Sequence, residues 1–451
     1  MGAKVSVILP SLNVAGCIRE CMDSVIGQSL QEMEIICVDA GSADGTREIL
    51  SGYAKKDDRI TVFDSDIKSY GRQVNMGLDH ANGEYIAVLE TDDWVESGMY
   101  QCLYEDAKKD QLDYAAADYD MFFQLQSGEY YYSRHRLFGG ERQGWYGRVL
   151  DSQQIAMLRA DDYVLWRGIY NRDFLNRHQI RLHESPGAAF QDMGFLQQVK
   201  TYAQKAKYID KSFYRYRQGR GEASSGKPEG LQYYHGEFLW LNSILEQANL
   251  RKIHEKYYCY TMSIAFLTKY EQVLSCLKGR WQDKRLADPW IWFRGQVLNA
   301  IKRGVLDEAI YGEEMWARLQ LLLASQESHA QFMAEREEEN RKPARELLER
   351  IGGLPVVIFG CGARGEKLML FLERNQVKIE AFCDNKEELD GGKKYGFPVI
   401  SPSKLKNGKI DSSMIILSMK HGVEQAYSQL ADMGIEPGRV ISRIPEGLLG
   451  N

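Results

Sequence analysis

Residues 5–46 read VSVILPSLNVAGCIRECMDSVIGQSLQEMEIICVDAGSADGT, and this stretch decides the fold. Val5 to Leu9 is an apolar run that predicts a strand, and Cys17 to Ile26 carries apolar residues at helical spacing. Glu34 to Val38 predicts a second strand. Strands and helices that alternate this quickly are typical of βαβ units on a largely parallel sheet. The sequence therefore predicts an α/β domain.

The alternation continues into a cluster of acidic residues. Residues 60–64 predict a third strand, and residues 74–83 predict a helix that ends at an Asn-Gly pair. Tyr85 to Leu89 predicts a fourth strand, which leads directly into Glu90-Thr91-Asp92-Asp93. Ligands of open parallel sheets bind beyond the carboxyl ends of the strands, so we expect a site there.

Three acidic positions stand at strand ends: Asp39, Asp66 and the pair Asp92-Asp93. A lone Asp commonly caps the next turn or helix, so Asp39 and Asp66 are also explained without function. The cluster with Glu90 is different, because carboxylates so close together repel one another and a divalent cation would relieve the repulsion. Oxygen ligands of this kind favour Mg²⁺ or Mn²⁺.

The pattern changes after the first domain. Residues 119–140 are rich in aromatic and polar side chains and predict irregular strands and loops that cover a cleft. Residues 231–350 give a helical signal, with a break expected at Asp288-Pro289. The end of this region, residues 334–350, is dense in charges of both signs, which predicts a solvated helix or helical linker with a break at Pro343.

A new domain begins near residue 350. Residues 354–385 predict a strand, a glycine turn, a helix and a second strand, and further strands follow at 414–418 and 439–441. The turn carries the GxGxxG motif between a predicted strand and a predicted helix, which is the context in which this motif indicates nucleotide binding. A carboxylate ends the next strand, at the position that binds ribose in such folds. The residues concerned are Gly360, Gly362, Gly365 and Asp384. We predict a small Rossmann-like domain that binds a nucleotide or nucleotide-sugar, or that has a structural or oligomerising role.

Composition limits the class of protein. The 451 residues carry a net charge of -6, with 27% charged and 44% apolar residues, which is typical of a soluble globular protein without general affinity for nucleic acid. The length predicts two or three domains. The patterns along the chain divide it into three regions, at 1–225, 226–349 and 350–451. The N-terminal sequence lacks a signal-peptide pattern, and we find no apolar run of about 18 residues. We therefore expect a cytoplasmic protein, either free in the cytoplasm or bound at the inner face of the membrane.

The first domain resembles the family 2 glycosyltransferases with a GT-A fold. The blocks VSVILPSLNVAGCIRECMDSVIGQS, EIICVDAGSADGTREIL and GEYIAVLETDDW occur in the family's order and spacing, and the match runs to about residue 220. The resemblance implies that the family's Asp-x-Asp motif corresponds to Glu90-Thr91-Asp92. Asp92 is then the direct ligand of the metal and Glu90 replaces the first Asp.

The resemblance also implies contacts with a nucleotide-sugar donor. Asp39 matches the first acidic position of the family's Asp-Asp-Gly-Ser turn, whereas Ala40 stands where relatives contact the base with a second acid. Leu12 replaces a usual Tyr. A UDP-sugar is the donor that the resemblance favours, and for Lys68, Tyr70 and Gln73 a solvated turn is the alternative reading. The donor-binding positions implied are Pro10, Asn13, Asp39, Lys68, Tyr70, Gln73 and Asp93.

A catalytic base is implied in the segment HESPGAAFQDMGFLQQV. Asp192 takes the family's base position at a helix start, with Gln191 in place of the usual Glu, and a plain helix cap fits the local sequence as well. Trp166 is predicted to form a wall of the sugar or acceptor pocket, or else to lie in the core. Nearby arginines could grip the diphosphate or lie on the solvated surface, namely Arg215, Arg217 and Arg220.

The expected function is therefore that of an inverting glycosyltransferase. The resemblance implies Mg²⁺ or Mn²⁺, a nucleotide-sugar donor, and a glycan or lipid-linked acceptor in bacterial surface polysaccharide, lipopolysaccharide or capsule synthesis. Two alternatives stay open: a scaffold or binding protein with a degraded site, which Ala40, Glu90 and Gln191 favour, and an NAD-dependent activity of the last domain. Association with a membrane and with further copies of the chain is compatible with the sequence.

Overall fold

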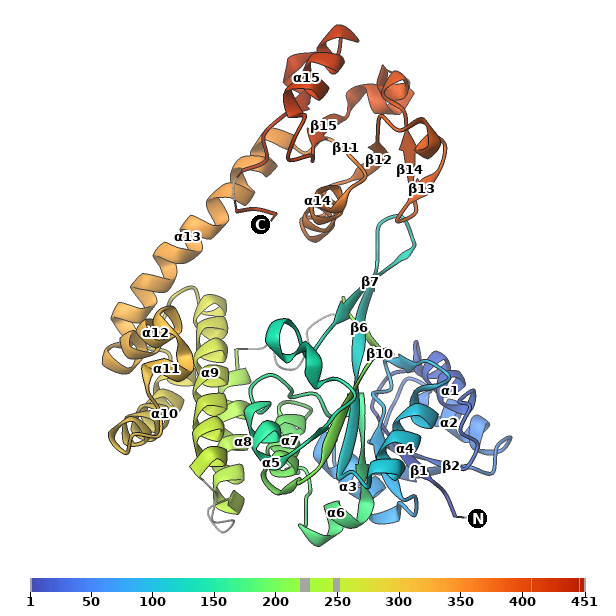
Figure 1. Ribbon diagram of the computed structural model, residues 1–451, viewed down its shortest axis with the longest axis vertical. Helices are drawn as coiled ribbons and strands as arrows, with labels where there is room; N and C mark the ends of the chain where they lie inside the picture. The colour runs from blue at the N-terminus through green and yellow to red at the C-terminus, as the bar shows by residue number, and fades with distance from the viewer. Residues whose placement is uncertain (1, 220–227, 246–251, 407, 446, 450–451) are drawn as a thin grey trace. The chain divides into compact units, whose positions relative to one another are not determined.

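The computed structural model describes residues 2–219, 228–245, 252–406, 408–445 and 447–449 (Figure 1). The chain forms two compact units. The first consists of Met1–Phe122 and Ser133–Gln331, and the second of Phe123–Tyr132 and Phe332–Asn451.

A mixed ten-stranded sheet forms the centre of the first unit. Its main path runs β3-β2-β1-β4-β9-β6-β10-β5, with β7 paired to β6 and β8 to β10. Strands β3, β2, β1 and β4 are parallel, as predicted, and β9 runs antiparallel to both of its neighbours. The strands are β1 (Val5–Ser11), β2 (Met33–Asp39), β3 (Ile60–Asp64), β4 (Tyr85–Val88), β5 (Trp94–Val95), β6 (Tyr114–Gln124), β7 (Tyr130–His135), β8 (Val149–Leu150), β9 (Gly168–Asn171) and β10 (Ala206–Arg217).

The two faces of this sheet bury two hydrophobic clusters. Side chains along β1 alternate between them, because Val7 and Leu9 belong to one cluster and Ile8 to the other. An added Cβ at Gly77 would overlap Ile8, so the glycine lets its helix approach the sheet closely. Helices α1 and α4 contribute to the first cluster, and α3, α6 and α7 to the second. The helices of this part are α1 (Ile18–Ile26), α2 (Thr46–Ala54), α3 (Tyr70–His80), α4 (Met99–Asp110), α5 (Ser152–Met157), α6 (Arg172–Arg177) and α7 (Gln191–Tyr202).

The described residues between 230 and 351 are mostly helical, but both predicted breaks are wrong. Pro289 lies inside a continuous helix and is buried, so packing outweighs the one backbone hydrogen bond that it removes. Pro343 also lies inside a helix, among exposed residues where water can satisfy the freed carbonyl. The helices are α8 (Gly230–Leu245), α9 (Lys252–Cys276), α10 (Lys284–Lys302), α11 (Glu308–Tyr311), α12 (Glu313–Ala324) and α13 (Gln326–Ile351).

The second unit contains a six-stranded sheet in the order β13-β14-β12-β11-β15-β16. Strands β14, β12, β11, β15 and β16 are parallel, and the order reverses between β11 and β15, as in doubly wound folds. Its regular elements are β11 (Val356–Phe359), α14 (Ala363–Arg374), β12 (Ile379–Cys383), β13 (Lys393–Lys394), β14 (Phe397–Ile400), β15 (Met414–Leu417), α15 (Val423–Asp432) and β16 (Val440–Ile441).

The aromatic segment predicted as irregular is a regular hairpin of β6 and β7, whose tip belongs to the second unit. Leu125 is 3% exposed in the core cluster of that unit, together with Leu347. The Tyr131 hydroxyl donates to Glu366 at 2.8 Å, and Ser127 Oγ donates to the Tyr395 carbonyl at 2.7 Å. The second unit thus includes a segment taken from the middle of the first.

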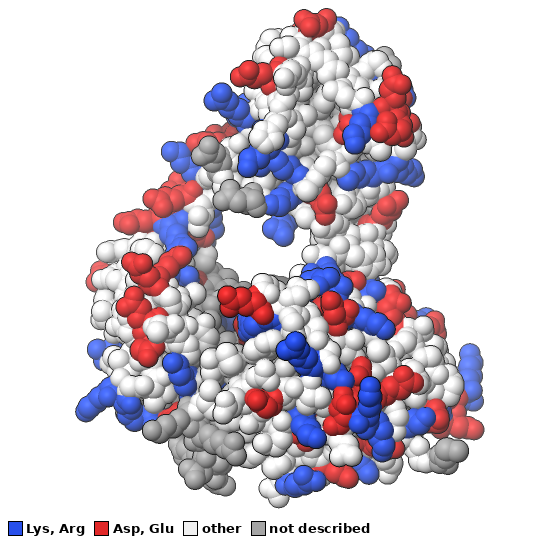
Figure 2. All heavy atoms as spheres, viewed as in Figure 1, with Lys and Arg blue, Asp and Glu red and all other residues white. Residues whose placement is uncertain are grey.

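The surface and the helices of the described residues give two further observations. On the face drawn in Figure 2, acidic and basic side chains are interspersed. No helix among the described residues is both long and apolar enough to cross a membrane.

Candidate active site

Loops at the carboxyl ends of β1, β2 and β4 are tied to one another. Asn13 accepts a hydrogen bond on Oδ1 from the Ala43 N–H at 2.9 Å, and its own N–H donates to Ser42 Oγ at 2.9 Å. The Thr91 hydroxyl donates to the carbonyl of Pro10 at 2.8 Å. Pro10 and Asn13, which the sequence offered as donor contacts, therefore also brace the loops that surround the carboxylate cluster.

The Asp39 carboxylate accepts hydrogen bonds within its own turn. Its carboxylate is 1% exposed and accepts hydrogen bonds from the Gly41 N–H at 3.0 Å, the Ser42 N–H at 2.9 Å and Ser42 Oγ at 2.5 Å. Ala40 beside it is buried, at 3% exposure. The structure thus gives Asp39 the role of an Asx-type turn stabiliser.

Glu90 and Tyr70 form a pair. The Tyr70 hydroxyl at the start of α3 donates to Glu90 Oε1 at 2.5 Å. Burial, together with the charges of Asp92 and Asp192, raises the pKa of Glu90 to about 8 even though the Tyr70 hydrogen bond lowers it. Glu90 is therefore mostly protonated near neutral pH when no cation is bound.

The adjacent acids Asp92 and Asp93 lie in opposite environments. Asp92 is partly exposed, and among the described residues no side chain or N–H donates a hydrogen bond to its carboxylate. Asp93 is 1% exposed and accepts from the Tyr214 hydroxyl at 2.8 Å and the Arg217 N–H at 2.7 Å. Burial and the charge of Asp92 raise the pKa of Asp93 well above its usual value. Asp92 is thus open to a ligand, while Asp93 fixes the loop.

Trp166 supports this loop from behind. It is 6% exposed and stacks on Tyr214 with ring centroids 4.1 Å apart, and it meets Tyr119 edge-on at 4.8 Å. Of the two readings that the sequence allowed, the structure therefore places Trp166 in the core.

The predicted donor contacts Lys68 and Gln73 differ in accessibility. Gln73 is 4% exposed, and its amide nitrogen donates to the carbonyls of Ser11 at 2.8 Å and Val38 at 2.7 Å, so it clamps α3 to the ends of β1 and β2. Lys68 is exposed. The Gly187 N–H donates to the Lys68 carbonyl at 2.9 Å, which holds the loop before α7 against the start of α3.

Asp192 is the second residue of α7 and joins the carboxylate cluster. Its Oδ1 accepts from the Met193 N–H at 2.8 Å. Burial, with a smaller contribution from the charge of Glu237, raises its pKa to about 6. Because its charge also raises the pKa of Glu90, the fold brings together carboxylates that are 100 positions apart in the sequence (Asp92 and Asp192).

Helix α7 is anchored by buried charges that the sequence analysis missed. Lys200 is fully buried, donates to the Leu158 carbonyl at 3.2 Å and lies 3.4 Å from the carboxylate of Asp162. Arg159 is also fully buried and donates to Gln197 Oε1 at 2.7 Å. No local pattern marks these residues, because each is separated from its partners by tens of positions along the chain.

The arginines near the end of β10 are neither free nor solvated. Arg215 is paired with Glu96 at 2.7 Å and Asp120 at 3.1 Å. Arg217 donates from Nε to the Asp92 carbonyl at 2.9 Å and is paired with Glu20. The prediction that these two side chains lie on the solvated surface is thus wrong, because each is 13% exposed. The predicted contact with the diphosphate stays a prediction, and Arg220 lies outside the described residues.

In the second unit, the glycine turn follows β11. Gly360 has φ +114, and an added Cβ at Gly365 would overlap the Gly360 carbonyl, so both positions require glycine. Gly362 is the N-cap of α14, and an added Cβ there would meet open space. Asp384 Oδ2 accepts from the Cys361 N–H at 2.9 Å, so the predicted ribose-binding carboxylate stabilises the turn itself.

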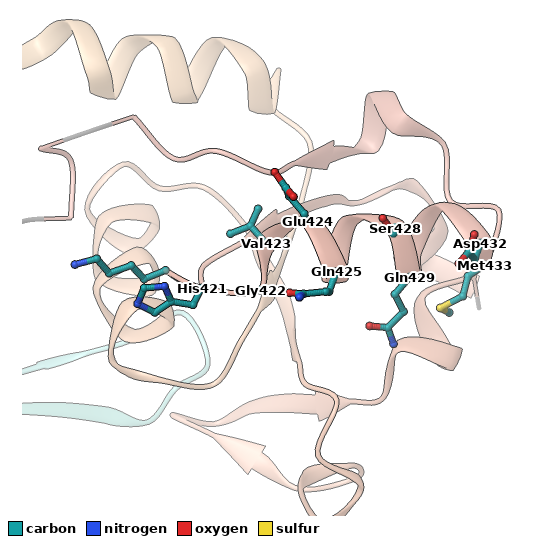
Figure 3. A pocket seen from close by; sticks show the side chains of 10 residues that line it. His421, Gly422, Val423, Glu424, Gln425, Ser428, Gln429, Asp432 and Met433 are labelled. Atoms are coloured by element: carbon teal, nitrogen blue, oxygen red, sulfur yellow. The ribbon is translucent and has the colours of Figure 1, made fainter.

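A hollow among the described residues lies elsewhere in this unit. It has a volume of about 1070 Å³ and runs along α15 and the turn before it (Figure 3). Its lining is polar, and Gln425 and Gln429 lie on the helix while His421 precedes it.

Comparison with known proteins identifies the family of the N-terminal domain. Residues 6–174 match the family described as Glycosyl transferase family 2. This domain belongs to glycosyltransferase family 2. The uncharacterized glycosyltransferase EpsJ of Bacillus subtilis is 31% identical to the chain over 220 residues, which are 48% of this chain and 61% of EpsJ. The cholesterol galactosyltransferase of Borreliella burgdorferi is 28% identical over 247 residues, which are 53% of this chain and 66% of that protein.

The family 2 domain also has a solved structural neighbour. The TarS 1–349 fragment of S. aureus matches with a TM-score of 0.51 at 17% identity, covering 75% of this chain and 92% of the fragment, which supports the GT-A fold. Residues 354–441 match the family described as C2185-like, N-terminal. The chain spans 61% of EpsJ and 31% of the glycosyltransferase GlyA of Streptococcus pneumoniae.

The family 2 domain presents oxygen ligands suited to a divalent cation, but few of them. Within the described ranges, no group of three or more His, Cys, Asp or Glu residues is arranged to hold a metal. Asp92 offers a partly exposed carboxylate without a hydrogen-bond donor among the described residues, and Glu90, two residues earlier, accepts a hydrogen bond from Tyr70. These side chains fit an ion that a bound diphosphate also ligates, since Mg²⁺ is usually held by one or two carboxylates plus phosphate oxygens.

Proposed function

We propose that this protein is an inverting glycosyltransferase that moves a sugar from a nucleoside diphosphate to an acceptor hydroxyl. The observation that carries the proposal is the electrostatic coupling of Glu90 with Asp92 and Asp192 at the carboxyl edge of the sheet. A transferase of this kind needs one group for the leaving diphosphate and another for the acceptor proton. Asp92 and Asp192 are the residues that supply them.

Asp192 is the base. As the acceptor oxygen attacks the anomeric carbon, the Asp192 carboxylate takes the hydroxyl proton, and the bond between sugar and diphosphate breaks on the opposite face. With a pKa raised to about 6, Asp192 is ionised at neutral pH yet more basic than an ordinary aspartate. One displacement by a hydroxyl inverts the anomeric configuration.

Asp92 is the residue that would hold Mg²⁺ or Mn²⁺, with Glu90 as its second carboxyl. When bound, the ion supplies positive charge that stabilises the leaving diphosphate. Asp93, through Tyr214 and Arg217, keeps the Asp92 backbone in place. Asn13 and Pro10 then hold the neighbouring loops where a nucleotide would lie.

The family and its members support a proposal for the donor and the acceptor. We propose a nucleotide-sugar donor, with UDP-sugars as the first to test, and a glycan or lipid-linked acceptor at a bacterial surface. A relative named poly(ribitol-phosphate) beta-glucosyltransferase is 34% identical over 114 residues, and a cholesterol galactosyltransferase is another relative, so polymeric and lipid acceptors both occur among similar proteins. The second unit is proposed to be a Rossmann-like domain that binds a nucleotide or nucleotide-sugar.

The test is a donor panel. The full chain is incubated with UDP-, GDP- and dTDP-sugars and Mn²⁺, and release of the nucleoside diphosphate is followed with and without EDTA. We expect EDTA-sensitive release from one donor class. Release that is absent for every donor, or unchanged by EDTA, would contradict the proposal.

A further inference from the structure

A buried carboxylate from α8 lies against the helix that carries Asp192. An added Cβ at Gly194 would overlap Glu237 Oε1, so the absence of a side chain at Gly194 admits the Glu237 carboxylate to the first turn of α7. The Glu237 side chain is 1% exposed, and its Oε1 has no hydrogen-bond partner among the described residues. Leaving such an atom unpaired is costly, which calls for an explanation.

The other oxygen of this carboxylate is held by a histidine. His183 Nδ1 lies 3.0 Å from Glu237 Oε2, and the His183 ring stacks on Trp240 with centroids 4.8 Å apart at an angle of 6°. His183 is 27% exposed, so its far edge reaches solvent. Its segment leads to the loop whose Gly187 carbonyl accepts from the Tyr70 N–H at 2.9 Å.

We propose that Glu237, seated by Gly194 and held by His183, is a positioning residue that sets the basicity of Asp192. This inference rests on the proposed role of Asp192 as the base. Glu237 is not placed to touch substrate, because it is buried behind α7. It acts through its charge and through its contact with the first turn of the helix.

The charges around Asp192 support this assignment. Burial and then the charge of Glu237 raise the pKa of Asp192, and burial also raises the pKa of Glu237 itself, which the His183 contact opposes. Among the described residues, titratable groups on three further elements are also coupled to Asp192. They are Glu90 after β4, Tyr70 on α3 and Tyr170 on β9. Of the carboxylates, Glu237 is the one behind α7 and outside the cluster that would hold the cation.

A measurement that does not need turnover tests the inference. Because the pKa of Asp192 is raised on folding, its ionisation costs stability progressively between about pH 4 and pH 6. The difference in thermal midpoint between Asp192→Asn and wild type should therefore increase as the pH rises from about 4 to about 6. This increase reports the titration of Asp192. The same difference is measured in the Glu237→Gln background.

We expect the titration midpoint to fall by about half a pH unit or more when Glu237 is neutralised, because a like charge near Asp192 is removed. Glu255→Gln, which neutralises an ion-paired glutamate on the neighbouring helix α9, is the matched control and should leave the midpoint unchanged. Coincident midpoints in the wild-type and Glu237→Gln backgrounds would overturn the inference. If Glu237→Gln lacks a cooperative transition, Glu237→Ala serves in its place.

A second pair of variants tests the contact between Gly194 and the Glu237 carboxylate. Gly194→Ala should lower the thermal midpoint, and Glu237→Ala in the same chain should restore part of the loss, because the overlapping carboxylate is then absent. Strictly additive losses would contradict the contact. If the enzyme is active, the acidic limb of its kcat/KM profile should move in the same direction as the stability titration. A chain that releases no nucleotide from any donor would refute the proposed function, while the stability titration would still decide this inference.

Discussion

The Tyr70 hydroxyl donates a hydrogen bond of 2.5 Å to Glu90 Oε1 and so joins the start of α3 to the turn that carries Asp92. This contact explains how a glutamate can stand where the family has an aspartate. The longer side chain reaches back to Tyr70 and leaves the open position to Asp92. One acid is thereby positioned and the other is free to bind.

Tyr70→Phe should weaken the binding of the metal ion without abolishing activity. The hydrogen bond from Tyr70 lowers the pKa of Glu90, so its loss leaves Glu90 more fully protonated and less able to assist a cation. We expect the Mn²⁺ concentration for half-maximal activity to rise by about 3- to 10-fold, since one hydrogen bond to a charged group is at stake. A Mn²⁺ titration that superimposes on that of wild type would exclude this role.

Replacing Asp92 and Glu90 by the corresponding neutral amides should lower kcat/KM by different amounts. Asp92→Asn removes the exposed ligand and should lower kcat/KM by about 100-fold or more. Glu90→Gln should cost less than about 10-fold, because burial disfavours the charged form of Glu90, which accepts from Tyr70, while Asp92 presents the exposed ligand. Steady-state kinetics at saturating Mn²⁺ measure both. A larger loss for Glu90→Gln than for Asp92→Asn would reverse the assignment.

Asp93 should be important for stability. Asp93→Ala leaves the Tyr214 hydroxyl and the Arg217 N–H without their buried acceptor, and we expect a loss of about 2–5 kcal/mol in the free energy of unfolding. Asp93→Asn should cost less, because the burial that raises the pKa of Asp93 disfavours its charged form and the amide oxygen can still accept one of the two hydrogen bonds. Denaturant unfolding monitored by circular dichroism compares the two. Equal losses would show that an amide cannot replace the carboxyl of Asp93 as the buried acceptor.

The hairpin tip should stabilise the second unit. Leu125→Ala creates a cavity in the core cluster that contains Leu347, and should lower the stability of this unit by about 2–5 kcal/mol. Limited proteolysis should then cut residues 356–441 earlier, while donor hydrolysis by the family 2 domain stays near its wild-type rate. The exposed change Tyr130→Ser is the control. Unchanged proteolysis of the Leu125 variant would contradict the assignment of the tip to this core.

The sequence was sufficient for the features that local patterns encode. Apolar runs and helical spacing placed β1, β2, β3 and β4 to within a few residues, and their carboxyl ends located Glu90 and Asp92. The base position, Asp192, came from the resemblance, since a helix cap fits the same local sequence. Its coupling to Glu90 depends on how α7 packs, which no local pattern contains.

The sequence failed where tertiary packing decides. Pro289 and Pro343 predicted breaks, yet both helices continue past them. Packing stabilises the helix at Pro289, and water can satisfy the freed carbonyl at Pro343. The exchange of residues 123–132 into the second unit has no local signature. Buried charges such as Lys200 looked like surface residues, because their partners are distant in the chain.

The pH dependence of activity should follow Asp192. Its raised pKa predicts that kcat/KM increases with pH along a limb centred near pH 6, since the carboxylate must be ionised to accept the proton. The profile is measured with the preferred donor under constant Mn²⁺. An activity that is flat from pH 5 to 8 would argue against a carboxylate base with this pKa.

The most direct test of the account is the substitution Asp192→Asn, with transfer and donor binding measured on the same preparation. The account predicts that kcat falls by roughly 100- to 10,000-fold, while the affinity for the nucleoside diphosphate with Mn²⁺ changes by less than about 3-fold, because Asp192 takes the acceptor proton and does not hold the donor. A variant that keeps wild-type turnover would contradict the central claim. A variant that loses nucleotide affinity in proportion to its activity would do so as well.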